Sequence, residues 1–312
     1  MAVYTVTGGA GFIGSHIVRR LAEEGHFVRV LDNFSTGSKK NLIGLPERIT
    51  IIEGDVRDRE IVSSAVQGAD YVLHLAAQIS VPISVENPVM NEEVNSGGTL
   101  NVLLAARNTG VKRVVLSSSC AIYGDNRDLP LKESSLPSPL SPYAITKLAG
   151  EHYCKAFHEL YGLPTVALRY LNVFGPGQRP DSAYAAVIPK FTHAIVNGLA
   201  PTIYGDGKQT RDFVFVENVV DANLLACKSD KAVGRVMNIG SGVEISLSQL
   251  LEMLERLIGQ KVTVSYGPPR TGDIVRSVGD ISLARELMGF ECKVDFEEGL
   301  KRTYKYFINE TI

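Results

Sequence analysis

The first half of the chain alternates between short apolar runs and longer segments whose apolar residues recur every three to four positions. The longer segments have helical spacing and lie near residues 12–25, 58–67, 87–108 and 142–161. The short runs, each typical of a buried strand, lie at residues 3–8, 27–32, 49–55, 70–77, 112–119 and 164–172. This alternation predicts an α/β fold in which a doubly wound parallel sheet carries helices on both faces.

The pattern changes after about residue 173. Glycine and proline become frequent, and the predicted strands and helices become shorter. We therefore expect residues 1–172 to form the main domain and residues 173–312 to form mostly a smaller α/β lobe. The run at 234–240 reads as a strand that returns to the main sheet, so we assign a segment near 215–242 to the first domain.

The composition of the 312-residue chain is that of an ordinary globular protein, with 45% hydrophobic residues and a formal net charge of −2. A near-neutral charge without a Lys/Arg block argues against nucleic acid as the main partner. No segment approaches 18 uninterrupted apolar residues and no secretory signal precedes the first strand, so we expect no membrane span and a cytoplasmic location. Cys120, Cys154, Cys227 and Cys292 lie far apart without a CxxC pair, which favours reduced, buried thiols over a metal site or disulfides.

A glycine-rich turn, TGGAGFIG at 7–14, follows the first predicted strand and opens the first predicted helix. Gly8, Gly11 and Gly14 allow a tight turn and a close backbone approach to a pyrophosphate, which the unpaired N–H groups of a helix N-terminus would bind. The alternative is an ordinary glycine turn. The strand–turn–helix context favours a dinucleotide site.

Acidic and small residues close the next strands. Asp32 ends the second strand 18 residues after Gly14 and no Arg follows it in DNFSTG, so it favours NAD over NADP by accepting hydrogen bonds from a ribose. Asp55 ends the third strand, where it either meets the adenine edge or caps a helix. The small residues at 75–77 either pack a helix closely or leave room for a flat dinucleotide.

The stretch SPYAITK at 141–147 is either a helix start that contains a tyrosine or an acid/base pair. Ser141 is a good N-cap and Pro142 a good first helical residue, which places Tyr143 and Lys147 on one helix face. A second Tyr-x-x-x-Lys match begins at Tyr204, but the GDG inside it indicates a turn.

Three hydroxyl residues, Ser117, Ser118 and Ser119, end the fifth strand at the edge where a dinucleotide would lie. Alone, they fit local hydrogen bonding at a strand end. Together with the helical Tyr143 and Lys147 and the glycine turn, they form a constellation for hydride transfer.

The joint pattern resembles the extended short-chain dehydrogenase/reductases that act on nucleotide sugars, and among them the UDP-glucose (UDP-galactose) 4-epimerases. The resemblance runs essentially from end to end. It is carried by TGGAGFIGSH, LDNFSTG, EGDVRD, HLAAQ, LSSSCAIYG, SPYAITK, LRYLNVFGP, QTRDFVFV and RTGD. It implies a Rossmann domain with tightly bound NAD, a UDP-sugar substrate, no metal, and a homodimer built on helices near 87–108 and 142–161.

The resemblance also implies roles for single residues. Tyr143 corresponds to the acid/base, Lys147 to its partner, and Ser119 to the hydroxyl that bridges Tyr143 and the sugar. The implied substrate site adds Asn172, Arg211 and Arg270 at the diphosphate, Asp273 at the uridine ribose and Tyr204 beside the uracil. The implied cofactor residues are Gly8, Gly11, Phe12, Ile13, Gly14, Asp32, Asn33, Thr36, Gly37, Asp55, Val56, Leu75, Ala76, Ala77, Gln78, Ser117, Tyr143, Lys147 and Tyr170, the last near the nicotinamide.

The implied reaction needs an unusually acidic tyrosine. Tyr143 as a phenolate takes the proton of the sugar 4-hydroxyl while hydride leaves C4, so its pKa must fall from near 10 to near 7, worth roughly 4 kcal/mol. We expect a neighbouring ammonium and a positive nicotinamide to supply that stabilisation. In the family, the position of Ser277 also widens or narrows the pocket beside the sugar 2-substituent, and a small Ser leaves room for an acetamido group.

Several related activities compete with a 4-epimerase. A 4,6-dehydratase would place an Asp-Glu pair where Cys120 and Ala121 stand, so the sequence disfavours it. A GDP-fucose synthase uses NADPH, which Asp32 opposes. A UDP-glucuronate 4-epimerase or decarboxylase, or another enzyme that modifies nucleotide sugars, stays open. From another class, a non-catalytic NAD-binding regulator stays open too, although an intact Ser119, Tyr143 and Lys147 set disfavours it.

Overall fold

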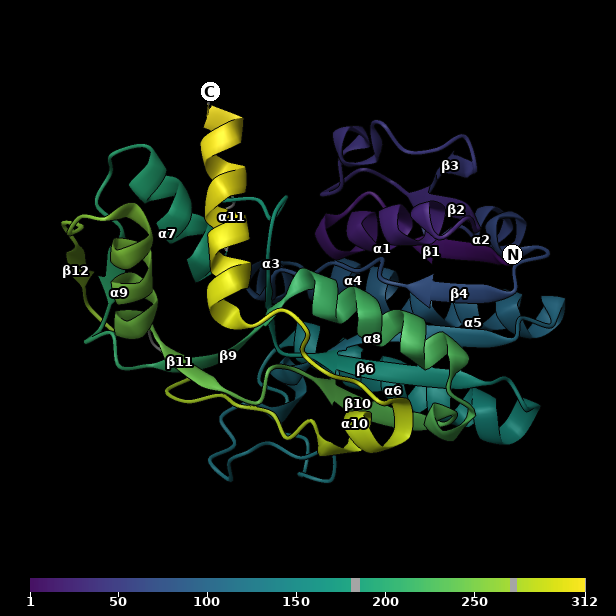
Figure 1. Cartoon of the computed structure of the whole chain (residues 1–312). Helices are drawn as coiled ribbons and strands as arrows, with labels where there is room; N and C mark the ends of the chain where they lie inside the picture. The colour runs from purple at the N-terminus through teal and green to yellow at the C-terminus, as the bar shows by residue number, and fades with distance from the viewer. Residues whose placement is uncertain (181–185, 270–273, 312) are drawn as a thin grey trace.

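The centre of the protein is a seven-stranded sheet in which every pairing is parallel, as a computed structural model of residues 1–180, 186–269 and 274–311 shows (Figure 1). The strand order is β10-β6-β5-β4-β1-β2-β3. The chain runs outward from β1 through β2 to β3 and then returns to the other side of β1 with β4, so the winding reverses between β1 and β4. Ligands of doubly wound sheets bind at such a reversal, beyond the carboxyl ends of the strands. The strands are β1 Val3–Thr7, β2 Phe27–Asp32, β3 Ile49–Glu53, β4 Tyr71–His74, β5 Arg113–Ser119, β6 Thr165–Tyr170 and β10 Arg235–Ile239.

Helices cover both faces of this sheet, which confirms the predicted α/β class. One face carries α1 Phe12–Glu23, α8 Val216–Lys228 and α10 Ser282–Met288, whose apolar residues share one core with β1 and β6. The other face carries α2 Arg59–Val66, α5 Gly98–Thr109 and α6 Pro142–Tyr161 over a second core. In the part of the chain that the structure describes, no helix is long and apolar enough to cross a membrane.

The segment expected to be helical at 87–108 is helical over 88–109, with a change of helix type in its middle. α3 Val81–Glu86 precedes it, and α4 Pro88–Glu92 leads into a π-helical turn, Glu93–Gly97, before α5 begins. The buried Asn95 in this turn accepts from the Gln78 amide at 2.8 Å and donates to the Gln78 carbonyl at 3.1 Å. The predicted helical segment is confirmed, but its π turn was not predicted, because helical periodicity does not report such buried polar contacts.

The smaller lobe stands beside the main sheet and has its own aromatic core (Figure 1). Its three-stranded sheet has the order β11-β9-β7, and β8 pairs with β12 alone. The core joins Phe174, Phe213 and Phe215 to residues of α8 and of the helices of the lobe. The elements of the lobe are β7 Asn172–Phe174, β8 Thr202–Tyr204, β9 Thr210–Phe215, β11 Glu244–Ser246, β12 Ser265–Gly267, α7 Val187–Val196, α9 Leu247–Ile258 and α11 Phe296–Thr311. Short 3₁₀ turns at Lys39–Leu42, Cys120–Tyr123 and Asp230–Ala232 belong to the main domain.

The four cysteines are free, as expected, but only two of them are buried. Cys154 and Cys227 lie in the cores of the main domain. Cys120 and Cys292 are partly exposed, which corrects the expectation of four buried thiols. The reason is position, because Cys120 begins the turn at the carboxyl edge of the sheet and Cys292 lies in a loop before α11.

Candidate functional site

The glycine turn between β1 and α1 lies directly against the loop that follows β4. Gly8 has a φ of +69°, and a Cβ placed on it would lie 2.7 Å from the Ala76 backbone nitrogen, so only glycine allows this approach. The N-cap of α1 is Gly11, which offers no side-chain hydrogen bond, and the first turn of α1 holds no acidic residue. Within the described residues, the N-terminus of α1 therefore has the geometry and potential that suit a pyrophosphate.

Asp32 joins the end of β2 to the same turn. One carboxylate oxygen accepts from the Ala10 amide at 2.9 Å and the other from the Phe34 amide at 2.8 Å. Phe34 adopts a φ of +57°, a left-handed conformation that costs free energy in a bulky residue and that the bond to Asp32 helps to hold. Gly37 packs beside the carboxylate, while Thr36 is exposed.

We expect Asp32→Ala to bind NAD at least about tenfold more weakly and to discriminate less against NADP, because a charge-assisted hydrogen bond contributes roughly 1.5–3 kcal/mol. Fluorescence titration with both cofactors measures the effect. Asp32→Asn is the matched control, since it keeps the shape of the side chain and removes the charge. An unchanged cofactor preference in both variants would show that another group reads the ribose.

Asp55 does not cap a helix, which removes one of its two predicted interpretations. Asp58 caps α2 instead, accepting from the amides of Glu60 and Ile61. Asp55 accepts from the Asn33 side chain at 2.8 Å and from the backbone amide, Nε and Nη2 of Arg57 at 2.9 Å each. Side-chain hydrogen bonds from Arg57 lower the pKa of Asp55 to about 2, so its carboxylate is charged throughout the neutral range.

The loop at 75–78 is held in place by the buried polar residues Thr7 and Asn95. The Ala76 amide donates to the Thr7 hydroxyl at 3.2 Å, and Asn95 holds both backbone groups of Gln78. Asn95 also donates to the Thr146 hydroxyl at 3.0 Å, and Thr146 donates to the Tyr143 carbonyl at 2.9 Å. Asn95 and Thr146 were not predicted from the sequence, because no spacing in the chain signals a contact made from a π turn.

The helix that carries Tyr143 and Lys147 begins where the sequence predicts. Ser141 caps α6 by accepting from the Ala144 amide at 3.2 Å, and Pro142 is the first helical residue. The Tyr143 amide donates to the buried Ser84 hydroxyl at 3.2 Å, which anchors the start of α6 to α3.

Ser119, Tyr143 and Lys147 come together at the carboxyl end of β5. The Lys147 ammonium lies 5.8 Å from the centroid of the Tyr143 ring and donates to the Ser117 carbonyl at 2.8 Å. Burial raises the pKa of Tyr143 to about 12, although a hydrogen bond with Ser119 opposes this. Burial likewise lowers the pKa of Lys147 to about 8, while Glu151 opposes that shift.

The pKa of Tyr143 thus moves away from the value near 7 that the reaction needs. The physical reason is that the loss of water around the phenol outweighs its hydrogen bond to Ser119. The expectation that a neighbouring ammonium and a positive nicotinamide together acidify Tyr143 stays a prediction.

The second Tyr-x-x-x-Lys match is a turn, as predicted. Gly205 and Gly207 have φ values of +82° and +75°, which no helix contains. Tyr204 instead lines a cavity of about 650 Å³ together with Asn172 and Arg211, so three predicted substrate residues meet in one place. Arg270 and Asp273 lie outside the described residues.

Other cavity residues were not predicted from the sequence. Lys190 and Phe191 reach the cavity from α7, and Thr202 and Gln209 from β8 and the turn after it. These residues come together at the cavity only through the tertiary fold of the smaller lobe, so no motif in the sequence predicts them. Tyr170, expected near the nicotinamide, is buried at the end of β6, where its hydroxyl and the Asn223 side chain of α8 exchange hydrogen bonds.

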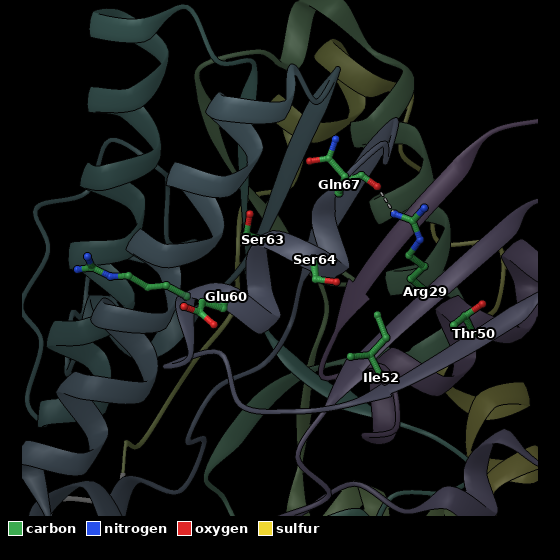
Figure 2. A pocket seen from close by; sticks show the side chains of 8 residues that line it. Arg29, Thr50, Ile52, Glu60, Ser63, Ser64 and Gln67 are labelled. Atoms are coloured by element: carbon green, nitrogen blue, oxygen red, sulfur yellow. Dashed lines mark hydrogen bonds between the residues drawn. The ribbon is translucent and has the colours of Figure 1, made fainter.

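A second hollow lies on the outer edge of the main sheet, away from these residues. Figure 2 shows its lining side chains, where Arg29 reaches the Gln67 carbonyl beyond the end of α2. None of the predicted site residues lines it. The lining comes from β2, β3 and α2 and consists of Arg29, Thr50, Ile52, Arg59, Glu60, Ser63, Ser64 and Gln67.

Comparisons with known proteins agree with this site. Residues 4–240 match the NAD dependent epimerase/dehydratase family. The structure is similar to a UDP-N-acetylglucosamine 4-epimerase from Methanobrevibacter ruminantium in complex with UDP-N-acetylmuramic acid, with 44% identity, 99% of each chain covered and a TM-score of 0.95. It is also similar to a Thermus thermophilus UDP-glucose 4-epimerase in complex with NAD, with 39% identity, 98% of each chain covered and a TM-score of 0.89.

A third similar structure is a UDP-glucuronic acid 4-epimerase variant from Bacillus cereus with a fluorinated UDP-glucuronic acid and NAD, at 31% identity, 99% of each chain covered and a TM-score of 0.91. All three relatives are 4-epimerases of UDP-sugars, and two of them hold NAD. The glycine turn, Asp32 and the loop after β4 fit the same cofactor. The chain therefore belongs to the NAD-dependent epimerase/dehydratase family and is a nucleotide-sugar epimerase that uses NAD.

Proposed function

We propose that the protein interconverts UDP-galactose and UDP-glucose by inverting C4 through a transient 4-keto sugar. The observation that carries this proposal is the meeting of Ser119, Tyr143 and Lys147 at the carboxyl end of β5. The cavity lined by Asn172, Tyr204 and Arg211 is suited to the UDP half of the substrate, with Asn172 and Arg211 at the diphosphate and Tyr204 beside the uracil.

Each catalytic side chain has one task in this reaction. Tyr143 as a phenolate removes the proton of the 4-hydroxyl, and Ser119 donates to the phenolate and orients the sugar. Lys147 holds the edge of β5 through the Ser117 carbonyl and contributes a positive charge beside the Tyr143 ring. NAD supplies a reversible hydride acceptor at C4 and a second positive charge, which is needed because burial raises the pKa of Tyr143.

Product analysis tests this function. The purified protein is incubated separately with UDP-galactose, UDP-N-acetylgalactosamine and UDP-glucuronate, without added NAD, and the products are identified. We expect UDP-glucose from UDP-galactose, because the reaction has no net redox change. Conversion of UDP-glucuronate alone would favour the glucuronate 4-epimerase or decarboxylase alternative. Bound NAD without turnover of any sugar would favour a non-catalytic regulator.

We further propose that UDP-N-acetyl sugars enter the site, with UDP-galactose the main substrate. Ser277 is small, and the family resemblance implies that an aromatic side chain at its position would narrow the pocket beside the sugar 2-substituent, although Ser277 is not among the residues that line the cavity of Asn172, Tyr204 and Arg211. The relative from Methanobrevibacter ruminantium, a UDP-N-acetylglucosamine 4-epimerase, supports this proposal. Ser277 is 6% exposed, so a bulky replacement there also strains the packing around it.

We expect measurable kcat/KM of the wild type for UDP-N-acetylgalactosamine and a selective loss of that activity in Ser277→Tyr. Ser277→Ala is the control, because it keeps the site open. Absence of wild-type activity on the N-acetyl sugar would overturn this proposal whatever the variants do.

We also propose a homodimer that pairs α4, α5 and α6 with their symmetry mates. Val102, Leu103 and Ala106 of α5 pack on the sheet, so the contact would use outward residues such as Val89 and Ile145, which are 66% and 52% exposed. Light scattering at micromolar concentration should give twice the chain mass, and Ile145→Asp should give a monomer. Ile43→Asp, at a 70% exposed site after β2, is the control. A monomeric wild type would rule the dimer out.

A further inference from the structure

A buried carboxylate outside the catalytic residues lies between the substrate cavity and the main sheet. Asp212 follows Arg211 in β9, and its side chain is fully buried. Ser241 donates to its Oδ1 with both its amide and its hydroxyl, each at 2.7 Å. The amides of Gly242 and Gly279 donate to its Oδ2 at 3.1 and 3.2 Å. A buried carboxylate with four donors holds a fixed geometry, because the loss of a donor leaves charge uncompensated.

The donors come from segments that join the two lobes. Ser241 and Gly242 connect β10 of the seven-stranded sheet to β11 of the small sheet. Gly279 follows Val278, whose carbonyl accepts from the Leu131 amide at 2.8 Å. The Asp212 carboxylate therefore joins β9 to the segment after β10 and to the segment at Gly279, which pairs with Leu131.

The backbone at the end of β10 is built around this carboxylate. A Cβ placed on Gly240 would lie 2.6 Å from Asp212 Oδ2, so any other residue there would displace the carboxylate or the strand. The close approach of the Gly240 backbone to the Asp212 carboxylate therefore requires a glycine at position 240.

The other side of Asp212 faces the proposed substrate residues. The Asn172 side chain donates to the Asp212 carbonyl at 3.2 Å, and Arg211 lines the cavity. Burial, and after it the negative charge of Asp212, raises the pKa of Cys120 to about 12. Asn172 comes two residues after Tyr170, which pairs with Ser119 across β5 and β6, so the Asn172–Asp212 bond links β9 to the catalytic edge of the sheet.

We propose that Asp212 is a positioning residue that fixes Arg211 and Asn172 relative to Ser119 and Tyr143, so that a sugar held by its diphosphate presents C4 to the phenolate. This inference rests on the proposed binding of a UDP-sugar. In this proposal Asp212 does not touch the reacting atoms. It aligns the lobe that binds the nucleotide with the catalytic edge of the sheet.

Calorimetric titration with UDP tests the assignment without using turnover. Asp212→Asn keeps the size of the side chain but points an amide donor at other donors, so we expect UDP to bind about tenfold or more weakly. Ser241→Ala removes one donor, and we expect a weakening of about two- to fivefold. Asp280→Asn is the matched control, because Asp280 lies beside Gly279 but accepts from Ser282 at the start of α10.

The titrations are made well below the unfolding temperature of each variant, so that a loss of stability alone does not change them. KM for the UDP-sugar should rise with the UDP dissociation constant, while the content of bound NAD stays at the wild-type level. UDP affinity within twofold of wild type in Ser241→Ala and in folded Asp212→Asn would overturn the proposal, and Ser241→Ala decides alone if Asp212→Asn does not fold. A wild type that binds no UDP contradicts the proposed function instead.

Discussion

Replacing Tyr143 by Phe should lower kcat at least about a hundredfold while NAD stays bound, because general acid–base catalysis typically contributes that much or more. Phe keeps the ring that packs at the start of α6 and removes only the hydroxyl that bonds to Ser119. Initial rates with UDP-galactose measure the loss, and quantifying NAD released on denaturation measures cofactor retention.

The control for this variant is Tyr161→Phe, at the far end of the same helix, where the side chain is 53% exposed and distant from the site. It should keep the wild-type rate. A Tyr143→Phe protein that retained more than a tenth of the wild-type rate would remove Tyr143 from the role of acid/base, whatever the fate of the cofactor.

The position of Tyr143 was predictable because it depends on local chemistry. Ser141 and Pro142 fix where α6 begins, and helical spacing then brings Lys147 to the same face. The parallel sheet was predictable for a similar reason, since each strand is a continuous apolar run between helical segments. In both cases neighbours in the sequence decide the structure.

The shifted pKa of Tyr143 was not predictable in the same way. Its direction depends on how much water the folded chain removes from the phenol, which spacing along one helix does not determine. Asn95 and Asp212 were missed for a related reason. Their partners, Gln78 and Ser241, are brought to them by the tertiary fold.

A buried ion pair between Arg169 and Glu151 lies behind the catalytic strand, and loss of one partner should destabilise the main domain strongly. Arg169 of β6 donates to both oxygens of Glu151 of α6, with Nε–Oε1 at 2.9 Å and Nη2–Oε2 at 2.8 Å, and both side chains are nearly fully buried. The Ser118 hydroxyl donates to the same carboxylate at 2.5 Å. Because Ser118 lies between Ser117 and Ser119, the pair also supports the strand end that carries the catalytic hydroxyl.

Arg169→Met should therefore lower the free energy of unfolding by about 3–5 kcal/mol, since it leaves the Glu151 carboxylate buried without its partner. The double variant Arg169→Met, Glu151→Met removes both charges and should recover most of that loss, because well-packed apolar residues often replace a buried pair at little cost. Denaturant titration of the single and double variants measures both values. Two results would contradict this: a single variant whose free energy of unfolding falls by less than about 1 kcal/mol, or a double variant less stable than the single one. Either would show that other groups compensate the Glu151 charge. The strand end would then owe its position to packing alone.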